Sequence, residues 1–84
     1  YNIGLAYFNQ AIEMNKDRQQ YRSKRAKIIE LYGLSRPYME KFRQLAPDDK
    51  GKWLAPLYTI YLNLNMGKEF DEIDKIRKEV KYEQ

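Results

Sequence analysis

The chain has 84 residues, with 16 Lys or Arg against 12 Asp or Glu, and it contains neither Cys nor His. A chain of this length makes one small domain, which leaves little core to enclose a deep active site. Without His or Cys it lacks the usual general base near neutral pH, the usual zinc ligands and a thiol nucleophile, which excludes most catalytic templates.

Other features also argue against catalysis. The four glycines are scattered and form neither a dinucleotide-binding loop nor a P-loop, and the carboxylates stand among lysines at spacings typical of helix caps and solvated faces. We therefore expect no enzyme activity, no cofactor and no bound metal. No apolar run approaches the roughly 20 residues of a membrane span. Because the sequence begins at Tyr1 without an initiator Met, we expect it to be part of a longer chain.

The first predicted helix covers about residues 2 to 15, where Ile3, Tyr7, Ala11 and Met14 form one apolar stripe. The second covers about residues 19 to 46. Its apolar residues repeat every seven positions, which favours one continuous helix. Tyr21, Ile28, Ser35 and Phe42 form one series at this interval, and Tyr32, Met39 and Ala46 form a second series interleaved with it.

Pro37 conflicts with a continuous second helix, because its ring points toward the carbonyl of residue 33. That residue is Gly33, so we expect a kink between positions 33 and 37; the alternative is two helices with a joint there. Pro47 ends the helix, and either Asp48 or Asp49 can cap the next one.

The third and fourth predicted helices cover about residues 50 to 65 and 68 to 81, and they form an antiparallel hairpin. Gly67 is expected to take the left-handed conformation between them. Pro56 predicts either a bend or a loosely wound first turn. The fold class is all-α with about four helices, and the expected core is Tyr7, Ala11, Ile28, Tyr32, Met39, Phe42, Ile60, Leu64, Phe70 and Ile73.

A family resemblance appears in the last two segments. The run Leu57-x-x-Ile60-Tyr61-x-x-Leu64, followed by Phe70-Asp71-Glu72-Ile73 and Val80, resembles a tetratricopeptide repeat, whose pattern is W-x-x-L-G-x-x-Y and then Y-D-E-A. Leu57 replaces the usual first aromatic residue. Tyr61 replaces a small residue that lets the paired helix approach, so the repeat is degenerate and its hairpin is expected to be splayed.

A partial match precedes it, because Ile3-Gly4-x-x-Tyr7 is similar to L-G-x-x-Y and Pro47 stands where such a repeat closes. An insertion of roughly 19 residues separates the two, which implies an elongated first hairpin. Together with Leu31-Tyr32, Pro37-Tyr38 and the run from Ala46 to Lys50, these residues resemble the C-terminal region of a group of bacterial tetratricopeptide proteins. The resemblance implies one domain, 1–84, with hairpins at 1–46 and 50–82.

The resemblance also implies a partner. One hairpin cannot cover its own apolar face, so upstream repeats or a second copy are expected to cover residues 1 to 14, while the polar end of the fourth helix, Arg77-Lys78-Glu79 and Lys81 to Gln84, acts as a cap. Relatives of this kind are often exported, and the compartment, exported (periplasmic) or cytoplasmic, stays open. In the repeat register, a concave peptide- or protein-binding groove would be lined by Asn2, Leu5, Asn9, Tyr58, Thr59, Leu62, Asn65 and Met66. Alternatively, Leu5, Tyr58 and Leu62 pack against a neighbouring repeat.

A basic run forms the strongest charge feature: Arg18, Arg22, Lys24, Arg25 and Lys27, with Arg18, Arg22 and Arg25 expected on one helix face. This run could contact phosphates or an acidic protein segment; the alternative is a solvated helix face. The leading hypothesis is a non-catalytic scaffold that binds another polypeptide in the groove. Nonspecific binding of nucleic acid or of an acidic partner through residues 18 to 27 is the second.

Overall fold

The computed structural model describes the backbone of residues 1–83 and the side chains of residues 1–19 and 21–80. Within these residues the chain is all helical, which confirms the predicted fold class. It forms five helices where about four were expected. They are α1 (Asn2–Lys16), α2 (Arg18–Ser23), α3 (Arg25–Leu45), α4 (Lys50–Asn63) and α5 (Gly67–Glu83).

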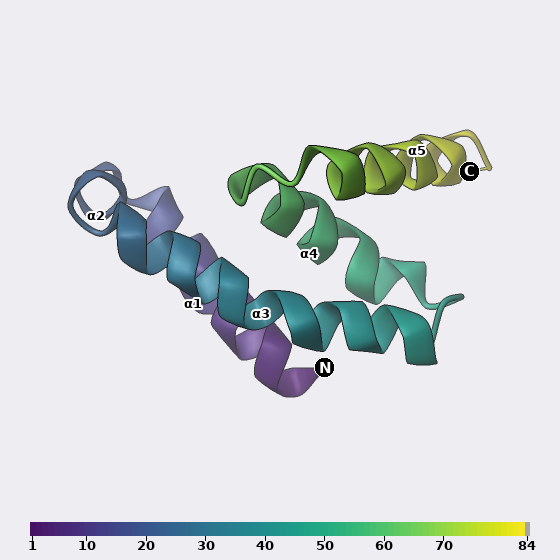
Figure 1. Cartoon of the computed structure of the whole chain (residues 1–84), viewed down its shortest axis with the longest axis horizontal. Helices are drawn as coiled ribbons and strands as arrows, with labels where there is room; N and C mark the ends of the chain where they lie inside the picture. The colour runs from purple at the N-terminus through teal and green to yellow at the C-terminus, as the bar shows by residue number, and fades with distance from the viewer. Residues whose placement is uncertain (84) are drawn as a thin grey trace.

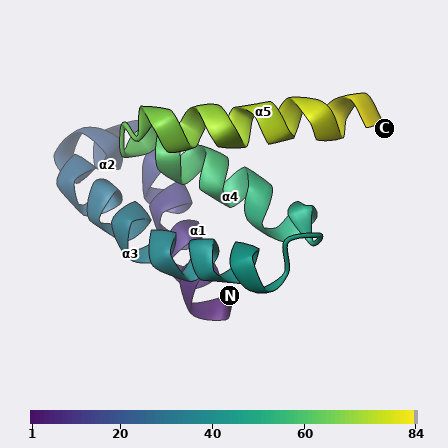
Figure 2. The same cartoon turned by 45° about the vertical axis from the view of Figure 1, so that its right-hand side comes forward.

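The helices form two hairpins that pack against each other through α3 and α4. α1 packs against α3, and α4 packs against α5, while α3 and α4 join the two pairs. Figure 1 and Figure 2 both show α4 between α3 and α5, and they show the short α2 at one end of the molecule. α4 therefore has a neighbouring helix on each of two sides.

The core combines residues from α1, α3, α4 and α5. Six of the ten expected core residues are buried: Ala11, Ile28, Tyr32, Met39, Ile60 and Ile73. The other four, Tyr7, Phe42, Leu64 and Phe70, are only half-buried and pack against the core from its edge. The buried core also includes Leu31, Trp53, Leu57 and Tyr61. The stripes therefore predicted the correct helix faces, but they placed the edge residues too deep.

The prediction of one continuous helix over residues 19 to 46 is wrong at its beginning. Lys24 interrupts it, because its backbone leaves the helical region with φ −122° and ψ 26°. The Ser23 hydroxyl donates a 2.8 Å hydrogen bond to the carbonyl oxygen of Gln19, a back-bonding pattern that often bends helices. Tyr21 is the one apolar residue of α2, so no apolar stripe runs from α2 into α3 to favour a single straight helix.

Pro37 does not divide α3, so the alternative of two helices joined between residues 33 and 37 is wrong. The ribbon of α3 changes direction partway along its length in both views, as expected of a helix that contains proline. Pro56 is likewise accommodated inside α4, where its ring is buried. Both prolines therefore lie within continuous helices.

The two ends of α4 differ from the predicted capping by aspartate and the predicted left-handed conformation of Gly67. Asp49 occupies the N-cap position, but its side chain makes no capping hydrogen bond and pairs at 3.5 Å with the Lys52 ammonium. At the other end, the left-handed residue is Asn65 with φ 56°, whereas Gly67 begins α5. Bonds from Met66 N to Tyr61 O and from Asn65 N to Leu62 O make this turn a Schellman motif, in which asparagine tolerates the left-handed conformation.

The predicted polar cap on α5 is described only in part. Arg77, Lys78 and Glu79 are exposed, and the side chains from Lys81 to Gln84 lie outside the described residues. Among the described residues, no helix is long and apolar enough to cross a membrane.

Candidate functional site

The most unusual surface of the molecule belongs to α4. From Trp53 through Gly67 the sequence contains no charged residue. One side of this stretch is buried toward the core through Trp53, Leu57, Ile60 and Tyr61. We call the opposite side the open face of α4, and it consists of Gly51, Ala55, Tyr58, Thr59 and Leu62.

The open face remains accessible although it is uncharged. Leu62 is 54% exposed, and Gly51 and Ala55 are also exposed. Gly51, Ala55, Tyr58 and Leu62 follow one another at spacings of four, three and four, which places them on one side of a helix. An uncharged helical stretch is normally covered on all sides, and the stretch that begins at Trp53 has one side open.

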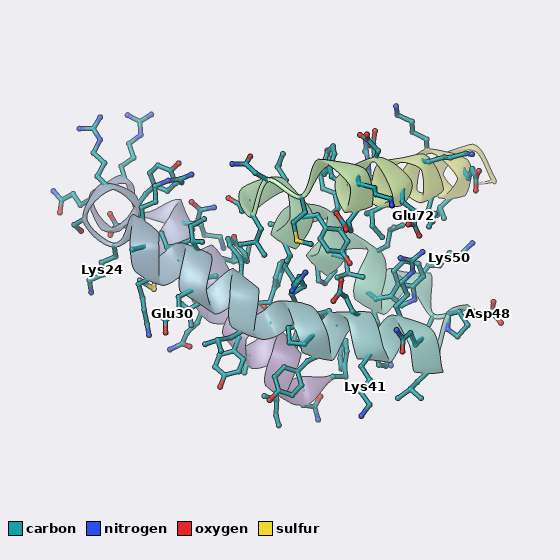
Figure 3. All side chains as sticks on the ribbon, in the orientation of Figure 1. Lys24, Glu30, Lys41, Asp48, Lys50 and Glu72 are labelled. Carbon is teal, nitrogen blue, oxygen red and sulfur yellow. The ribbon has the colours of Figure 1, made fainter. Side chains whose placement is uncertain are left out.

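A hollow of about 250 Å³ lies along the open face, between α4 and α5. Its apolar wall comes from Leu54, Ala55 and Tyr58, with Gly51 and Thr59 beside them. Two cationic residues, Lys50 and Arg77, also line it. Lys50 is the first residue of α4 and lies at the end of the molecule opposite to α2 (Figure 3). The hollow therefore combines an apolar wall with positive charge.

Arg77 is held in place by two neighbours. Its Nε and Nη2 atoms donate hydrogen bonds to Asp74 Oδ1 at 3.2 and 3.0 Å, and its guanidinium carbon lies 4.9 Å from the centre of the Tyr58 ring. The Tyr58 ring in turn packs against Phe70 with ring centres 4.9 Å apart. Hydrogen bonds from Arg77 and Lys78 lower the pKa of the Asp74 carboxyl group. These contacts fix one wall of the hollow.

A second hollow, of about 150 Å³, lies at the turn between α4 and α5. It brings together Leu62, Asn65 and Met66 of the predicted groove set, with Tyr61, Gly67 and Phe70. Tyr58 and Thr59 of the same set line the first hollow instead. The five predicted α4 and turn residues are therefore divided between two adjacent hollows of one hairpin.

The α1 part of the predicted groove lies apart from these hollows. Asn2 and Asn9 are exposed, while Leu5 is half-buried and packs against the core. The start of α1 does lie beside the start of α4, because the Lys52 ammonium is 5.8 Å from the centre of the Tyr1 ring. Contact of a single ligand with both sets stays a prediction.

Sequence reasoning missed several residues of the hollow: Lys50, Gly51, Leu54, Ala55 and Arg77. The repeat register drew attention to Tyr58 and Leu62 and gave no role to the small residues one turn earlier. A signal was present in the sequence, since the stretch from Trp53 to Gly67 lacks charge on every side. Arg77 could be placed there only once the packing of α5 on α4 was known.

The predicted basic run forms a tip at α2. Arg18, Arg22, Lys24, Arg25 and Lys27 are all exposed, and Figure 3 shows Lys24 at this end of the molecule. Arg18 and Arg22 line a hollow of about 370 Å³ with Asn15 and Tyr21. Because the helix breaks at Lys24, Arg25 belongs to α3, and the expected face of three arginines on a single helix does not exist.

The last two basic residues of the tip have local partners. Arg25 donates a 2.6 Å hydrogen bond to the Tyr21 hydroxyl, and its guanidinium carbon lies 5.1 Å from the centre of that ring. The Lys27 ammonium pairs with Glu30 at 3.7 Å. Arg18 and Arg22 are the tip residues that face the hollow.

A hydrogen bond between two titratable side chains joins α4 to α3. The Tyr61 hydroxyl donates a 2.6 Å hydrogen bond to Glu40 Oε2. Burial first, and then this hydrogen bond, raise the pKa of Tyr61, so its phenol stays protonated in the folded chain. Among the described residues there is no cluster of three or more acidic side chains that could hold a metal ion. The hydrogen bond between Tyr61 and Glu40 therefore links α4 to α3 on the buried side of α4.

Comparison with models of protein families, with curated proteins and with solved structures found no match to this chain.

Proposed function

We propose that this chain is a non-catalytic helical scaffold that binds another polypeptide through the open face of α4. The observation that carries the proposal is the uncharged stretch from Trp53 to Gly67, one side of which is open and bordered by an apolar hollow. Such a surface gains free energy when a partner covers it, at about 25 cal/mol for each Å² of apolar area removed from water.

The residues of the open face suit a protein partner. Tyr58 offers a large ring that Phe70 and Arg77 already hold in place, so little conformational entropy is lost when a partner binds. Leu62 projects from the same side, and Gly51 and Ala55 leave room for a partner to approach. Aromatic anchors with small neighbours are typical of surfaces where a few residues supply most of the binding energy.

We further propose that the two hairpins are of tetratricopeptide type. Two features support this: the repeat-like pattern from Leu57 to Val80, and the succession of contacts from α1 to α3, α4 and α5. In such repeats the first helix of each hairpin lines the concave surface. The open face of α4 would then belong to the groove, together with Asn2, Leu5 and Asn9 of α1.

Selection from a random peptide library displayed on phage tests the proposal. Peptides selected on the wild-type chain are then measured against Ala55→Gln and Leu62→Gln. Both positions are exposed, so glutamine is expected to leave the fold intact while it removes apolar contact. Each substitution should weaken binding about tenfold or more if the side chain is buried by the peptide.

Leu45→Gln is the matched control. Leu45 is 75% exposed at the end of α3 and lines neither hollow of the α4–α5 hairpin, so the same chemical change there should leave binding unaltered. Circular dichroism melts would verify that all three variants remain folded. The proposal is wrong if the selected peptides bind the two α4 variants as tightly as they bind the wild type.

A second candidate function rests on the distribution of charge. Residues 16 to 27 hold six of the sixteen cationic side chains and one of the twelve acidic ones, so the rest of the chain has ten cations against eleven acids. The net positive charge is thus concentrated at the α2 tip, which favours contact with phosphates or an acidic protein segment. Replacing Arg18, Arg22 and Arg25 by Gln tests this, because binding through the tip should be lost on substitution and should weaken steeply with salt.

A further inference from the structure

We infer that the polypeptide bound at the open face of α4 presents a large apolar side chain with a carboxylate beside it. The apolar group enters the hollow between α4 and α5, and the carboxylate pairs with Lys50 and Arg77. This inference rests on the proposed function and specifies the chemistry of the partner.

The shape of the hollow supports the apolar half of the inference. Leu54, Ala55 and Tyr58 form its wall, and Leu54 and Tyr58 are only half-buried by the chain itself. A partner side chain in the hollow would complete their burial. Because the volume is about 250 Å³, it has room for a side chain as large as leucine or an aromatic residue, and a methyl group would leave most of it empty.

The ammonium group of Lys50 supports the second part of the inference, that the partner presents a carboxylate. Among the described residues, no carboxylate forms an ion pair with the Lys50 ammonium, although its neighbour Lys52 pairs with Asp49 at 3.5 Å. Lys50 is also the first residue of α4, where the positive end of the helix dipole disfavours a cation. A lysine at this position costs some helix stability, and an incoming carboxylate would remove that cost.

Arg77 adds a second donor to the same place. It uses Nε and Nη2 on Asp74, so Nη1 takes no part in those bonds and can bind an oxygen of the partner. Asp74 does not reverse the sign of the local charge, because it is shared between Arg77 at 3.0 Å and Lys78 at 3.2 Å. The residues that line the hollow include two cations, Lys50 and Arg77, and no acid.

The test uses the most strongly enriched library peptide and a derivative in which its Asp or Glu is replaced by Asn or Gln. On the wild-type chain, we expect enriched peptides to pair a large apolar residue with a carboxylate. Lys50→Gln and Arg77→Gln should each weaken binding of the acidic peptide about two- to fivefold, the range of partly exposed ion pairs. The amide derivative loses both ion pairs, so it should bind the wild type about four- to twentyfold more weakly than the acidic peptide does, and its binding should be insensitive to Lys50→Gln.

Lys75→Gln is the matched control, since Lys75 is exposed on α5 and does not line the hollow. Lys50→Gln removes no ion pair among the described residues, so a change in binding cannot be ascribed to a lost internal contact. If peptides depend on Ala55 and Leu62 but carry no carboxylate, or ignore Lys50→Gln, the inference is overturned and the proposed function stands. If binding does not depend on Ala55 and Leu62, the proposed function itself fails.

Discussion

The Ser35 hydroxyl donates a 2.6 Å hydrogen bond to the backbone carbonyl oxygen of Gly4, across the contact between α3 and α1. Both residues are buried. A Cβ atom placed on Gly4 would lie 2.6 Å from the Cβ of Tyr38, closer than side-chain atoms normally approach. The first hairpin therefore depends on a glycine at position 4, whereas Gly33 within α3 has no atom near the corresponding point.

This difference predicts opposite effects for two identical substitutions. Gly4→Ala forces α1 and α3 apart and should lower the free energy of unfolding, because overpacking costs about 1–3 kcal/mol and the gain in helix propensity returns only about 1 kcal/mol. Gly33→Ala should raise it by up to about 1 kcal/mol, since propensity acts there alone. Urea denaturation of both variants provides the measurement, and equal effects would refute the close packing at Gly4.

Tyr61 predicts a dependence of stability on alkaline pH. Its pKa is raised in the folded chain by burial and by the hydrogen bond to Glu40, while an unfolded tyrosine ionises near pH 10. The folded state thus keeps a proton that the unfolded state releases, so this contribution is complete below about pH 10 and is lost as the pH rises further. Tyr61→Phe should cost about 1 kcal/mol at neutral pH. The difference in the free energy of unfolding between Tyr61→Phe and the wild type should disappear in denaturation curves measured above pH 10. A difference that does not change with pH would contradict the assignment.

The different burial of two isoleucines in α5 predicts different losses of stability when each is replaced by alanine. Ile73 is fully buried, whereas Ile76 is only half-buried three residues later. Ile73→Ala should therefore lower the free energy of unfolding by about 2–5 kcal/mol, and Ile76→Ala should cost clearly less. Thermal melts give the order directly. A larger loss for Ile76 would mean that α5 is rotated about its axis relative to the described packing.

Pro37 predicts a gain in stability when it is removed from α3. Its ring is exposed and it lies inside the helix, where proline costs about 3 kcal/mol through the missing hydrogen bond and the clash with the preceding turn. Pro37→Ala should raise the melting temperature unless the change of direction in α3 is needed for Met39 and Phe42 to reach the core. A lower melting temperature would show that the bend is required by the packing.

The sequence predicts the helices and most of the core well, because the stripes of α1, α4 and α5 repeat with the helical period. It fails where periodicity is absent. α2 has one apolar residue, so nothing in its pattern distinguishes a continuation of α3 from a separate helix. The hydrogen bond from Ser23 to Gln19, which directly precedes the break at Lys24, could not be predicted from that pattern. Asn65 replaces Gly67 as the left-handed residue, because the position of the turn depends on where α4 ends.

The candidate site is predicted only in part. Tyr58, Thr59 and Leu62, which the repeat register assigned to a groove, lie on the open face of α4. Lys50 and Arg77 could not be associated with them from the sequence, since they are separated by much of the hairpin and meet only when α5 folds back along α4. The contact between Arg77 and the Tyr58 ring is a consequence of that packing.

An NMR titration of the isotopically labelled chain with the most enriched peptide tests the central claim most directly. The open face of α4 should give the largest changes in backbone amide shifts, at Gly51, Ala55, Thr59 and Leu62, and the amides around Leu45 at the end of α3 should not shift. Changes concentrated between Arg18 and Lys27 would contradict the account and would place the binding surface at the α2 tip.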